Sequence, residues 1–248
     1  MNVLAIDIGN TRIKWGCGGS GGWLRQGWVP TAQPQALAAE FSGLPAPGRI
    51  VMSCVAGEAV RDAVAAVLPA SAAPPLWLAA SAAQCGVRSS YADPATLGPD
   101  RWAALIAARH MTGSACVVAN AGTTMTVDAL GADGVFLGGC IVPGARLMRE
   151  AMARDTANLA LRDGAFSYFP DNTGDALYSG AVNALAGAIG QMARYLGDIT
   201  GAPPPVILSG GDAGLVEKRL NVQVTVVDNL VLEGLLHIAL QSATRSRT

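Results

Sequence analysis

The sequence predicts an α/β protein with two related halves, in which helices pack on the faces of β-sheets. Short apolar runs of the kind that form buried strands alternate along the chain with segments of helical periodicity. A strand–turn–strand unit near the N-terminus recurs near the middle of the chain, and such repetition is a fold-level signal. Apolar residues make up 51% of the 248 residues and charged residues only 14%, so the chain can bury one large core or two modest ones.

The first strand–turn–strand unit lies in Val3–Gly16. An apolar run ends at Asp7, and the small polar turn Gly9–Thr11 follows before a second strand begins. Glycine lets the backbone at such a turn approach a phosphate group closely. Asp7 could hold a hydrated Mg²⁺ and Lys14 could face phosphate oxygens, although an ordinary hairpin with a surface lysine fits the same residues.

The segments that follow continue the alternation of strands and helices. Proline and glycine turns separate them, as expected for an α/β sheet with helices on its faces. The expected order is strand 23–29, helix 35–41, strand 49–53, helix 58–68 and strand 76–78.

The segment Tyr91–Met111 contains turn signals and then a helix. Pro99 suits the start of a helix, and the helix dipole favours Asp100 in the first turn by about 0.3–1 kcal/mol. Stabilisation of the helix is therefore one explanation for Asp100. The other is an acidic group aimed at a substrate hydroxyl, with Arg101 holding a carboxylate through two hydrogen bonds. Composition alone does not separate these two explanations.

The second strand–turn–strand unit, Ala115–Leu130, repeats the first. The sequences LAIDIGNTRIKW and VVANAGTTMTVD share an apolar strand, then Asp or Asn, then a glycine turn with threonine, then a strand. A third glycine turn follows a buried strand in Val206–Asp212. Two hairpins, one in each half, can hold the phosphates of a nucleotide between them, and the third turn would let a flat base lie against backbone.

Two further helices are expected in the second half. Gly138–Gly144 leads into a helix that carries Leu147, Met148 and Met152. Tyr178–Leu196 has apolar residues at helical spacing, which fits a face buried in the core or a face of a dimer.

Charge and composition narrow the classes of function. The net charge of −1 argues against nucleic acid as the main partner, because binding to a phosphate backbone needs a basic surface. No apolar run approaches the roughly 20 residues of a membrane span and no secretion signal is visible, so a cytoplasmic protein is expected. Five scattered cysteines without Cys-x-x-Cys spacing indicate reduced thiols rather than a zinc site or disulfides. His110 and His237 lie in helical patterns and are expected to be packed helix residues.

The motifs DIGNTRIKWG, GPDR, NAGTTMTVD, GGCIVPG and SGGD together resemble the type III pantothenate kinase family, from Val3 to about Leu236. The resemblance implies two ribonuclease-H-like domains of the actin-like ATPase superfamily, expected at residues 1–112 and 113–248. It implies a homodimer that transfers the γ-phosphoryl group of ATP to the hydroxyl of pantothenate. This reaction is the first step toward coenzyme A.

The resemblance also implies the residues of the site. Asp100 would be the general base, Asp7 would place Mg²⁺ through water, and Thr173 would reach pantothenate from the neighbouring subunit. The residues implied for ATP are Asp7, Ile8, Gly9, Asn10, Thr11, Arg12, Ile13, Lys14 and Thr123. Those implied for pantothenate are Tyr91, Gly98, Pro99, Asp100, Arg101 and Thr173.

The sequence departs from the family at two places. The family usually has aspartate at the position of Asn120, where it helps to hold a monovalent cation such as K⁺ or NH₄⁺. The family commonly has proline after Asn158 and Leu159, where this chain continues with Ala160. The first departure places the cation site in question, and the second concerns a loop.

Two other functions stay open on the sequence alone. Some relatives have been proposed as regulators of transcription, and a kinase-like fold does not prove catalysis. A kinase of the same superfamily for another sugar or carboxylate is also possible. A DNA-binding regulator should carry a basic face or a helix-turn-helix segment, and the sequence has neither signal.

Overall fold

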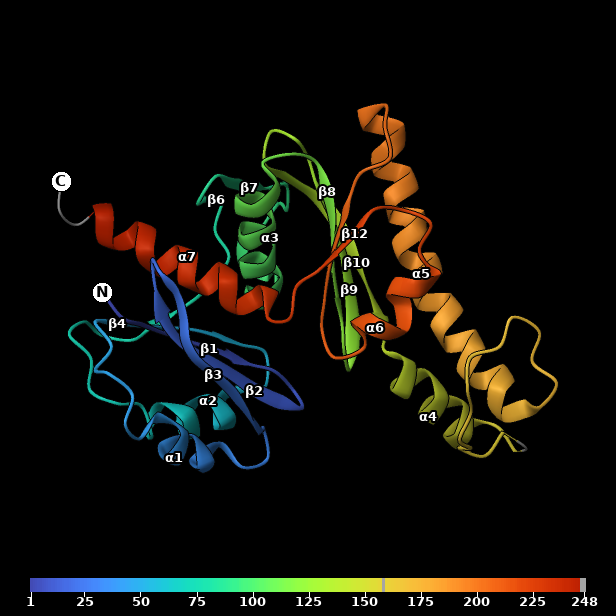
Figure 1. Ribbon diagram of the computed structural model, residues 1–248, viewed down its shortest axis with the longest axis horizontal. Coiled ribbons are helices and arrows are strands. Elements are labelled where there is room, and N and C mark those ends of the chain that lie inside the picture. Colours follow the sequence, from blue (N-terminus) through green and yellow to red (C-terminus); the bar gives the residue numbers. More distant parts are fainter. Residues whose placement is uncertain (158, 246–248) are drawn as a thin grey trace. The chain divides into compact units, whose positions relative to one another are not determined.

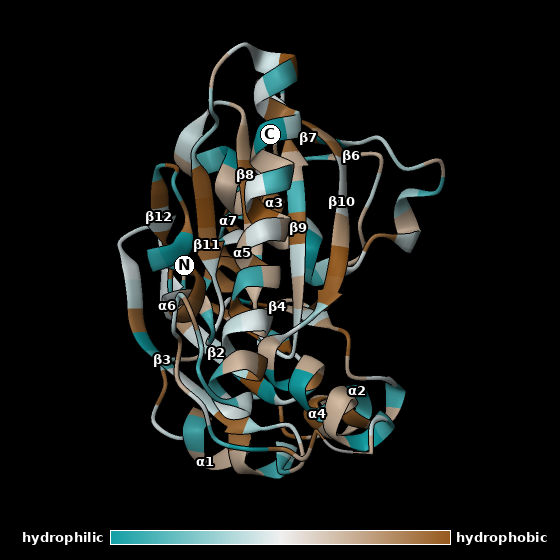
Figure 2. Cartoon of the chain, turned by 90° about the vertical axis from the view of Figure 1, so that its right-hand side faces the viewer, coloured by the Kyte–Doolittle hydropathy of each residue, from teal (hydrophilic) through white to brown (hydrophobic). Residues whose placement is uncertain are grey.

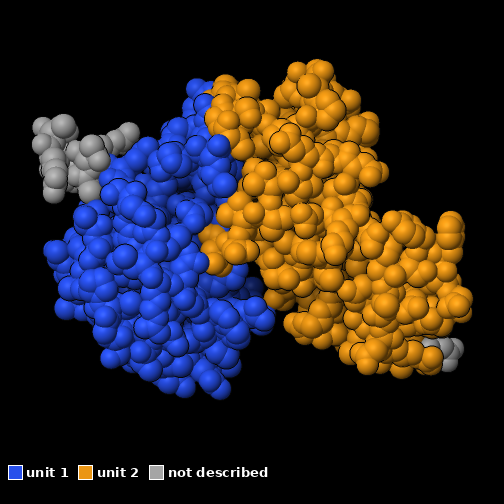
Figure 3. All heavy atoms as spheres, in the orientation of Figure 1, with its two compact units in different colours: residues 1–111, 230–248 blue, residues 112–229 orange. Residues whose placement is uncertain are grey.

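The computed structural model describes residues 1–157 and 159–245 and divides into two compact units. Unit 1 comprises Met1–Met111 with Leu230–Thr248, and unit 2 comprises Thr112–Asn229 (Figure 3). This division differs from the expected second domain, 113–248, in the last helix, α7 (Leu230–Arg245).

Unit 1 contains a five-stranded sheet in the order β3-β2-β1-β4-β5 (Figure 1). Strand β1 is antiparallel to β2 and parallel to β4. The strands are β1 (Val3–Ile8), β2 (Arg12–Gly19), β3 (Gly22–Pro30), β4 (Arg49–Cys54) and β5 (Leu76–Trp77). The strands expected from the sequence are therefore present. Their ends shift by one or two residues, except that β2 continues three residues past the expected end at Gly16.

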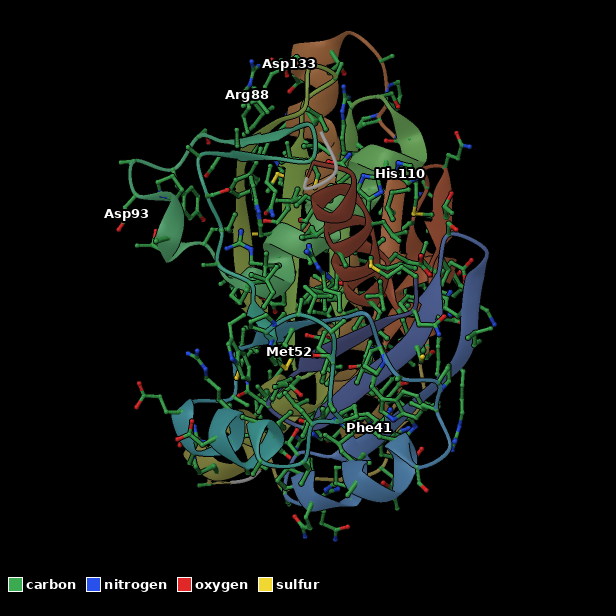
Figure 4. All side chains as sticks on the ribbon, turned by 90° about the vertical axis from the view of Figure 1, so that its left-hand side faces the viewer. Phe41, Met52, Arg88, Asp93, His110 and Asp133 are labelled. Carbon is green, nitrogen blue, oxygen red and sulfur yellow. The ribbon has the colours of Figure 1, made fainter. Side chains whose placement is uncertain are left out.

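One face of this sheet packs against two short helices, α1 (Leu37–Phe41) and α2 (Glu58–Ala65). Phe41 of α1 meets the ring of Trp15 edge-to-face, with the ring centroids 5.6 Å apart. Phe41 and Met52, both labelled in Figure 4, belong to this apolar core. A short 3-10 turn, η1 (Pro34–Ala36), precedes α1.

The other face of the sheet is where α7 packs, against β1, β2 and β4. Gly16 and Gly18 have no side chains and leave room for the ring of Trp23, because a Cβ on Gly16 would lie 2.6 Å from that ring. The Trp23 indole N–H donates to a carboxylate oxygen of Glu233 on α7 at 2.6 Å. These contacts are the physical reason that α7 belongs to unit 1.

Helix α3 (Pro99–Thr112) crosses α7 at close range. A Cβ on Gly234 of α7 would lie 1.9 Å from the main-chain oxygen of Ala103, so only glycine fits there. The ring centroids of His110 and His237 lie 4.1 Å apart, with the ring planes tilted by 35°. His110, labelled in Figure 4, is exposed, so the expectation of a packed helix residue fits only the partly buried His237.

Three small elements complete unit 1. They are the hairpin of β6 (Ala83–Gln84) and β7 (Val87–Ser89) and the 3-10 turn η2 (Pro94–Thr96). The hairpin turns through Cys85 and Gly86, both with positive φ, which suits a two-residue turn. The five cysteines, all among the described residues, are thiols and not disulfides.

Unit 2 contains the strand order β12-β11-β8-β9-β10. Strands β8 and β9 form the second hairpin, and β11 runs parallel to β8. The hydropathy colouring shows the apolar character of β11 (Figure 2). The strands are β8 (Cys116–Ala121), β9 (Thr124–Leu130), β10 (Val135–Pro143), β11 (Val206–Ser209) and β12 (Val224–Val226).

The helices of unit 2 are α4 (Ala145–Asp155), α5 (Thr173–Thr200) and α6 (Ala213–Val216), and a 3-10 turn, η3 (Glu217–Arg219), follows them. The apolar stripe of α5 packs on the sheet, where Leu185 and Ile189 are fully buried. The run of residues 138–144 forms the end of β10 and leads directly into α4, as the sequence predicted. In the ranges 1–157 and 159–245, no helix is both long and apolar enough to span a membrane.

Candidate functional site

The candidate site in unit 1 begins where β1 ends. Asp7 pairs with Lys14 across the β1–β2 hairpin and with Ser53 on the parallel strand β4. The Ser53 hydroxyl donates to Oδ1 of Asp7 at 2.6 Å, and Ser53 itself is completely buried. The carboxyl group is thus held by the Ser53 hydroxyl, and Lys14 is its cross-strand neighbour.

The surroundings of Asp7 shift its pKa strongly. The pKa of Asp7 is raised to about 6, mainly because its carboxyl group is buried and in part because of the negative charge of Asp100. The hydrogen bond from Ser53 and the charge of Lys14 act in the opposite direction. A buried carboxylate near a second carboxylate is a site that a cation would stabilise.

The tip of the first hairpin is fixed by three hydrogen bonds. The amide of Gly9 donates to the main-chain oxygen of Arg12 at 3.1 Å. Thr31, at the end of β3, donates from its hydroxyl to the oxygen of Gly9 at 2.7 Å and from its amide to the oxygen of Thr11 at 3.1 Å. These bonds tie down the turn whose amides are expected to face phosphate.

The other residues implied for ATP fall into two groups on this hairpin. Ile8 and Ile13 are fully buried in the core of unit 1, so only their backbone is available to a ligand. Asn10, Thr11 and Arg12 are exposed at the tip, and the Arg12 guanidinium lies over the ring of Trp28, 4.4 Å from its centroid.

The GPDR motif forms the start of α3, within unit 1. Asp100 lies in the first turn, and its Oδ1 accepts a hydrogen bond from the Arg101 amide at 2.8 Å. Gly98 lies close to this carboxylate, since a Cβ there would be 2.7 Å from Oδ1. The guanidinium of Arg101 is buried, and its Nη1 donates to the Tyr91 hydroxyl at 3.4 Å. The structure therefore brings Tyr91, Gly98, Pro99, Asp100 and Arg101 together.

The pKa of Asp100 is also raised, mainly because its carboxyl group is removed from water. The Arg101 amide and the Arg101 charge lower it in part. Two carboxyl groups in one unit thus have raised pKa values, and such perturbed groups are common at catalytic sites.

The second hairpin carries the residues implied for unit 2. Asn120 pairs with Thr126 across β8–β9, and the amide of Gly122 donates to the oxygen of Thr124 at 3.1 Å. The main-chain oxygen of Thr123 accepts from the amide of Gly144 at 2.9 Å. Thr123 therefore lies at the tip of this hairpin, next to the GGCIVPG motif.

Thr173 begins helix α5. The side chain of Asn172 caps this helix by accepting from the Asp175 amide at 2.9 Å. Thr173 is exposed and lines a cavity of about 490 Å³ together with Met152, Asp171 and Leu177. This cavity lies within unit 2. Asn158, next to the second departure from the family, lies outside the described residues.

Sequence reasoning missed two residues that contact the first hairpin from neighbouring strands, Ser53 and Thr31. A signal for Ser53 was present, because it is a polar residue at the carboxyl end of an apolar strand. Pairing that strand beside β1 would have placed it next to Asp7. In the described part of the chain, no three His, Cys, Asp or Glu side chains gather as a metal-binding cluster.

Comparison with known proteins identifies the family. A model of the family described as type III pantothenate kinase matches residues 3–195. The type III pantothenate kinase of Nitrosospira multiformis is 47% identical over 241 residues, which cover 97% of this chain and 92% of that protein.

Solved structures show the fold. A Baf family transcriptional activator from Campylobacter jejuni has a TM-score of 0.60 at 19% identity, covering 97% of this chain and 99% of that one. An activator of 2-hydroxyisocaproyl-CoA dehydratase from Clostridium difficile, solved with bound ADPNP, has a TM-score of 0.57 at 14% identity, covering 100% of this chain and 97% of that one. The chain therefore shares its fold with these proteins, and the predicted α/β fold class is confirmed. Together with the family match, these comparisons confirm the predicted resemblance: the chain belongs to the type III pantothenate kinase family and is a kinase.

Proposed function

We propose that this protein transfers the γ-phosphoryl group of ATP to the hydroxyl of pantothenate, giving 4′-phosphopantothenate for coenzyme A synthesis. The observation that carries the proposal is the grouping of Asp7, Lys14, Asp100 and Arg101 in one unit. Phosphoryl transfer mainly needs positioned reactants and charges that stabilise the phosphates. These four residues supply two carboxylates and two cations for that purpose.

The first hairpin is proposed to bind the phosphates of ATP. Its exposed turn, Gly9–Thr11, offers backbone amides, and the ammonium group of Lys14 on β2 supplies a point charge. Thr123 at the tip of the second hairpin is proposed to contact ATP as well. The buried side chains of Ile8 and Ile13 hold the first hairpin on its sheet.

Asp7 is proposed to hold Mg²⁺ through water. Mg²⁺ usually keeps several waters and binds one or two carboxylates together with substrate phosphates. Asp7 fits this pattern, because one of its oxygens is bonded to Ser53 and its carboxyl group is stabilised by a positive charge. When bound, the ion would neutralise charge on the phosphates.

Asp100 is proposed to be the general base. It accepts the proton of the pantothenate hydroxyl while that oxygen bonds to the γ-phosphorus and the bond to the leaving ADP oxygen breaks. Burial raises the pKa of Asp100, which makes it a better proton acceptor than an exposed aspartate. Its position in the first turn of α3 fixes the carboxylate relative to Arg101.

Arg101 is proposed to bind the carboxylate of pantothenate. Its planar guanidinium can donate two parallel hydrogen bonds to a carboxylate. The group is buried and in contact with Tyr91, so little freedom is lost when substrate binds. Tyr91, Gly98 and Pro99 would line the same pocket.

The active unit is proposed to be a homodimer formed through α5. Gly180, Ala184 and Gly187 are exposed along this helix, and a Cβ on either glycine would meet no atom within 4 Å. Ile199 further along is 73% exposed. A second copy packed here would bring Thr173 toward the partner's pantothenate.

Sedimentation at assay concentrations should give twice the chain mass of 25.2 kDa, and Gly187→Arg should give monomers. A fully active monomer would contradict the proposal.

One assay tests the proposed reaction. ADP release is measured with and without pantothenate, and the product is identified by its mass. Sugars and small carboxylates tested in place of pantothenate separate this reaction from that of another kinase in the superfamily. ADP release that pantothenate does not stimulate would refute the proposal.

A further inference from the structure

Both halves of the chain place a serine at the same point of the fold. In unit 1, Ser53 on β4 pairs with Asp7 at the end of the parallel strand β1. In unit 2, Ser209 on β11 pairs with Asn120 at the end of the parallel strand β8. The two serines are 0% and 2% exposed. The position is thus repeated and buried in both halves, but only in unit 1 does the serine pair with an acid.

The two hydroxyl groups make different contacts. The Ser53 hydroxyl donates to Asp7 Oδ1 at 2.6 Å, a length typical of a hydrogen bond to a charged oxygen. The Ser209 hydroxyl donates to the main-chain oxygen of Asp228 at 3.5 Å, which is a long contact. Ser53 therefore makes a short bond to a carboxylate oxygen, whereas the bond of its counterpart to Asp228 is long.

We propose that Ser53 is a positioning residue that holds one oxygen of Asp7 so that the other oxygen faces the hydrated Mg²⁺ of the bound nucleotide. This inference rests on the role proposed above for Asp7. A carboxylate rotates about its Cβ–Cγ bond unless one oxygen is anchored, and Ser53 is a buried anchor on a regular strand. Groups that orient a metal-binding carboxylate commonly contribute about 10–100-fold to metal affinity.

Binding of Mn²⁺ tests this inference. Mn²⁺ replaces Mg²⁺ as a paramagnetic probe, and free Mn²⁺ is measured by electron paramagnetic resonance in the presence of a non-hydrolysable ATP analogue. Ser53→Ala should weaken Mn²⁺ binding about 10–100-fold. Ser53→Thr keeps the hydroxyl and should bind Mn²⁺ about as tightly as the wild type. Ser53→Val has the shape of threonine without the hydroxyl and should lose as much affinity for Mn²⁺ as Ser53→Ala. Ser209→Ala is the matched control and should bind Mn²⁺ like wild type.

Two results would overturn the inference. The first is unchanged Mn²⁺ binding in Ser53→Ala. The second is an equal loss in Ser53→Thr and Ser53→Val, since that would assign Ser53 to packing alone. The proposed function is tested separately by product formation in the wild type. A wild type that binds Mn²⁺ and nucleotide but leaves pantothenate unchanged would refute the reaction and still allow the role of Ser53 to be decided.

Discussion

The two hairpins share a pattern in sequence and differ in what surrounds them. In the first, Asp7 stands opposite Lys14, so the end of the strand carries two opposite charges. In the second, Asn120 stands opposite Thr126, and neither side chain is charged. The repeated strands therefore preserve a shape, while the ionisable groups of this pair occur in unit 1 alone.

The tips of the hairpins are also supported in different ways. The first is held by a side chain, since the Thr31 hydroxyl bonds to Gly9. The second is held by close backbone contacts. A Cβ on Gly144 or on Gly210 would lie 2.0 Å from a main-chain oxygen of the hairpin. Removing the Thr31 hydroxyl would cost the first tip one hydrogen bond. Replacing Gly144 or Gly210 would instead force the backbone at the second tip to move.

The largest effect should follow from substitution of Asp100, the acidic residue that lies in unit 1 together with the first hairpin. Asp100→Asn keeps the size of the side chain but removes the base, so kcat should fall about 10²–10⁴-fold. Binding of ATP should survive. Asp62→Asn, an exposed aspartate on α2, is the control and should turn over normally. Near-normal turnover of Asp100→Asn would remove Asp100 from the chemistry.

Arg101→Lys should give the next largest effect. Lysine keeps the positive charge but loses the planar pair of donors, so the KM for pantothenate should rise about tenfold or more, with little change in the KM for ATP. Steady-state kinetics with each substrate varied in turn measures both constants. If both rise alike, Arg101 serves the fold or the nucleotide, and the division of roles within unit 1 is wrong.

Much of this site could be predicted because its residues are close in sequence. Asp7 and Lys14 face each other as soon as a hairpin is recognised, and Asp100 precedes Arg101 in one helical turn. Ser53 and Thr31 could not be placed in this way. Each acts through the pairing of strands that are distant in sequence, and periodicity does not specify which strands pair.

The fold shows the same limit. The alternation of apolar runs predicted β1 and β4 to within one residue and β2 to within three. The assignment of α7 to unit 1 needed tertiary contacts, such as the space above Gly16 that admits Trp23. Short strands such as β6 and β12 have too few residues for any periodic signal.

Asp7→Asn should reveal how much the charge of the buried Asp7, which the second hairpin lacks, lowers the free energy of unfolding. An unfolded aspartate titrates near 3.8, and burial raises the pKa of folded Asp7 to about 6. Between these values the folded state binds more protons, so the free energy of unfolding falls as the pH rises through this window. The loss should be about 1–3 kcal/mol without metal, given that Asp7 keeps some exposure.

Urea unfolding in a chelator at pH 4.5 and pH 7.5 measures this loss. Asp7→Asn should remove it and leave the variant more stable than wild type at the higher pH, although inactive. Asp100, whose pKa is also raised by burial, contributes in the same direction, and the same comparison made in an Asp100→Asn background removes its contribution. If the free energy of unfolding depends on pH equally in wild type and Asp7→Asn, the charge of Asp7 does not destabilise the folded state.

The smallest expected effect concerns the uncharged counterpart of Asp7. Asparagine at position 120 offers a cation only a carbonyl dipole, so K⁺ held mainly there should bind more weakly than beside a carboxylate. Asn120→Asp would put an acid next to Ser209, as Asp7 lies next to Ser53. Activation should then need less K⁺. Titration of K⁺ against a bulky organic cation at constant ionic strength, in both proteins, measures the shift.

The competing explanation is that backbone oxygens or the buried Asp128 complete a cation site unaided. In that case both proteins would give the same steep activation curve, and the difference in charge between the two hairpins would have no bearing on K⁺.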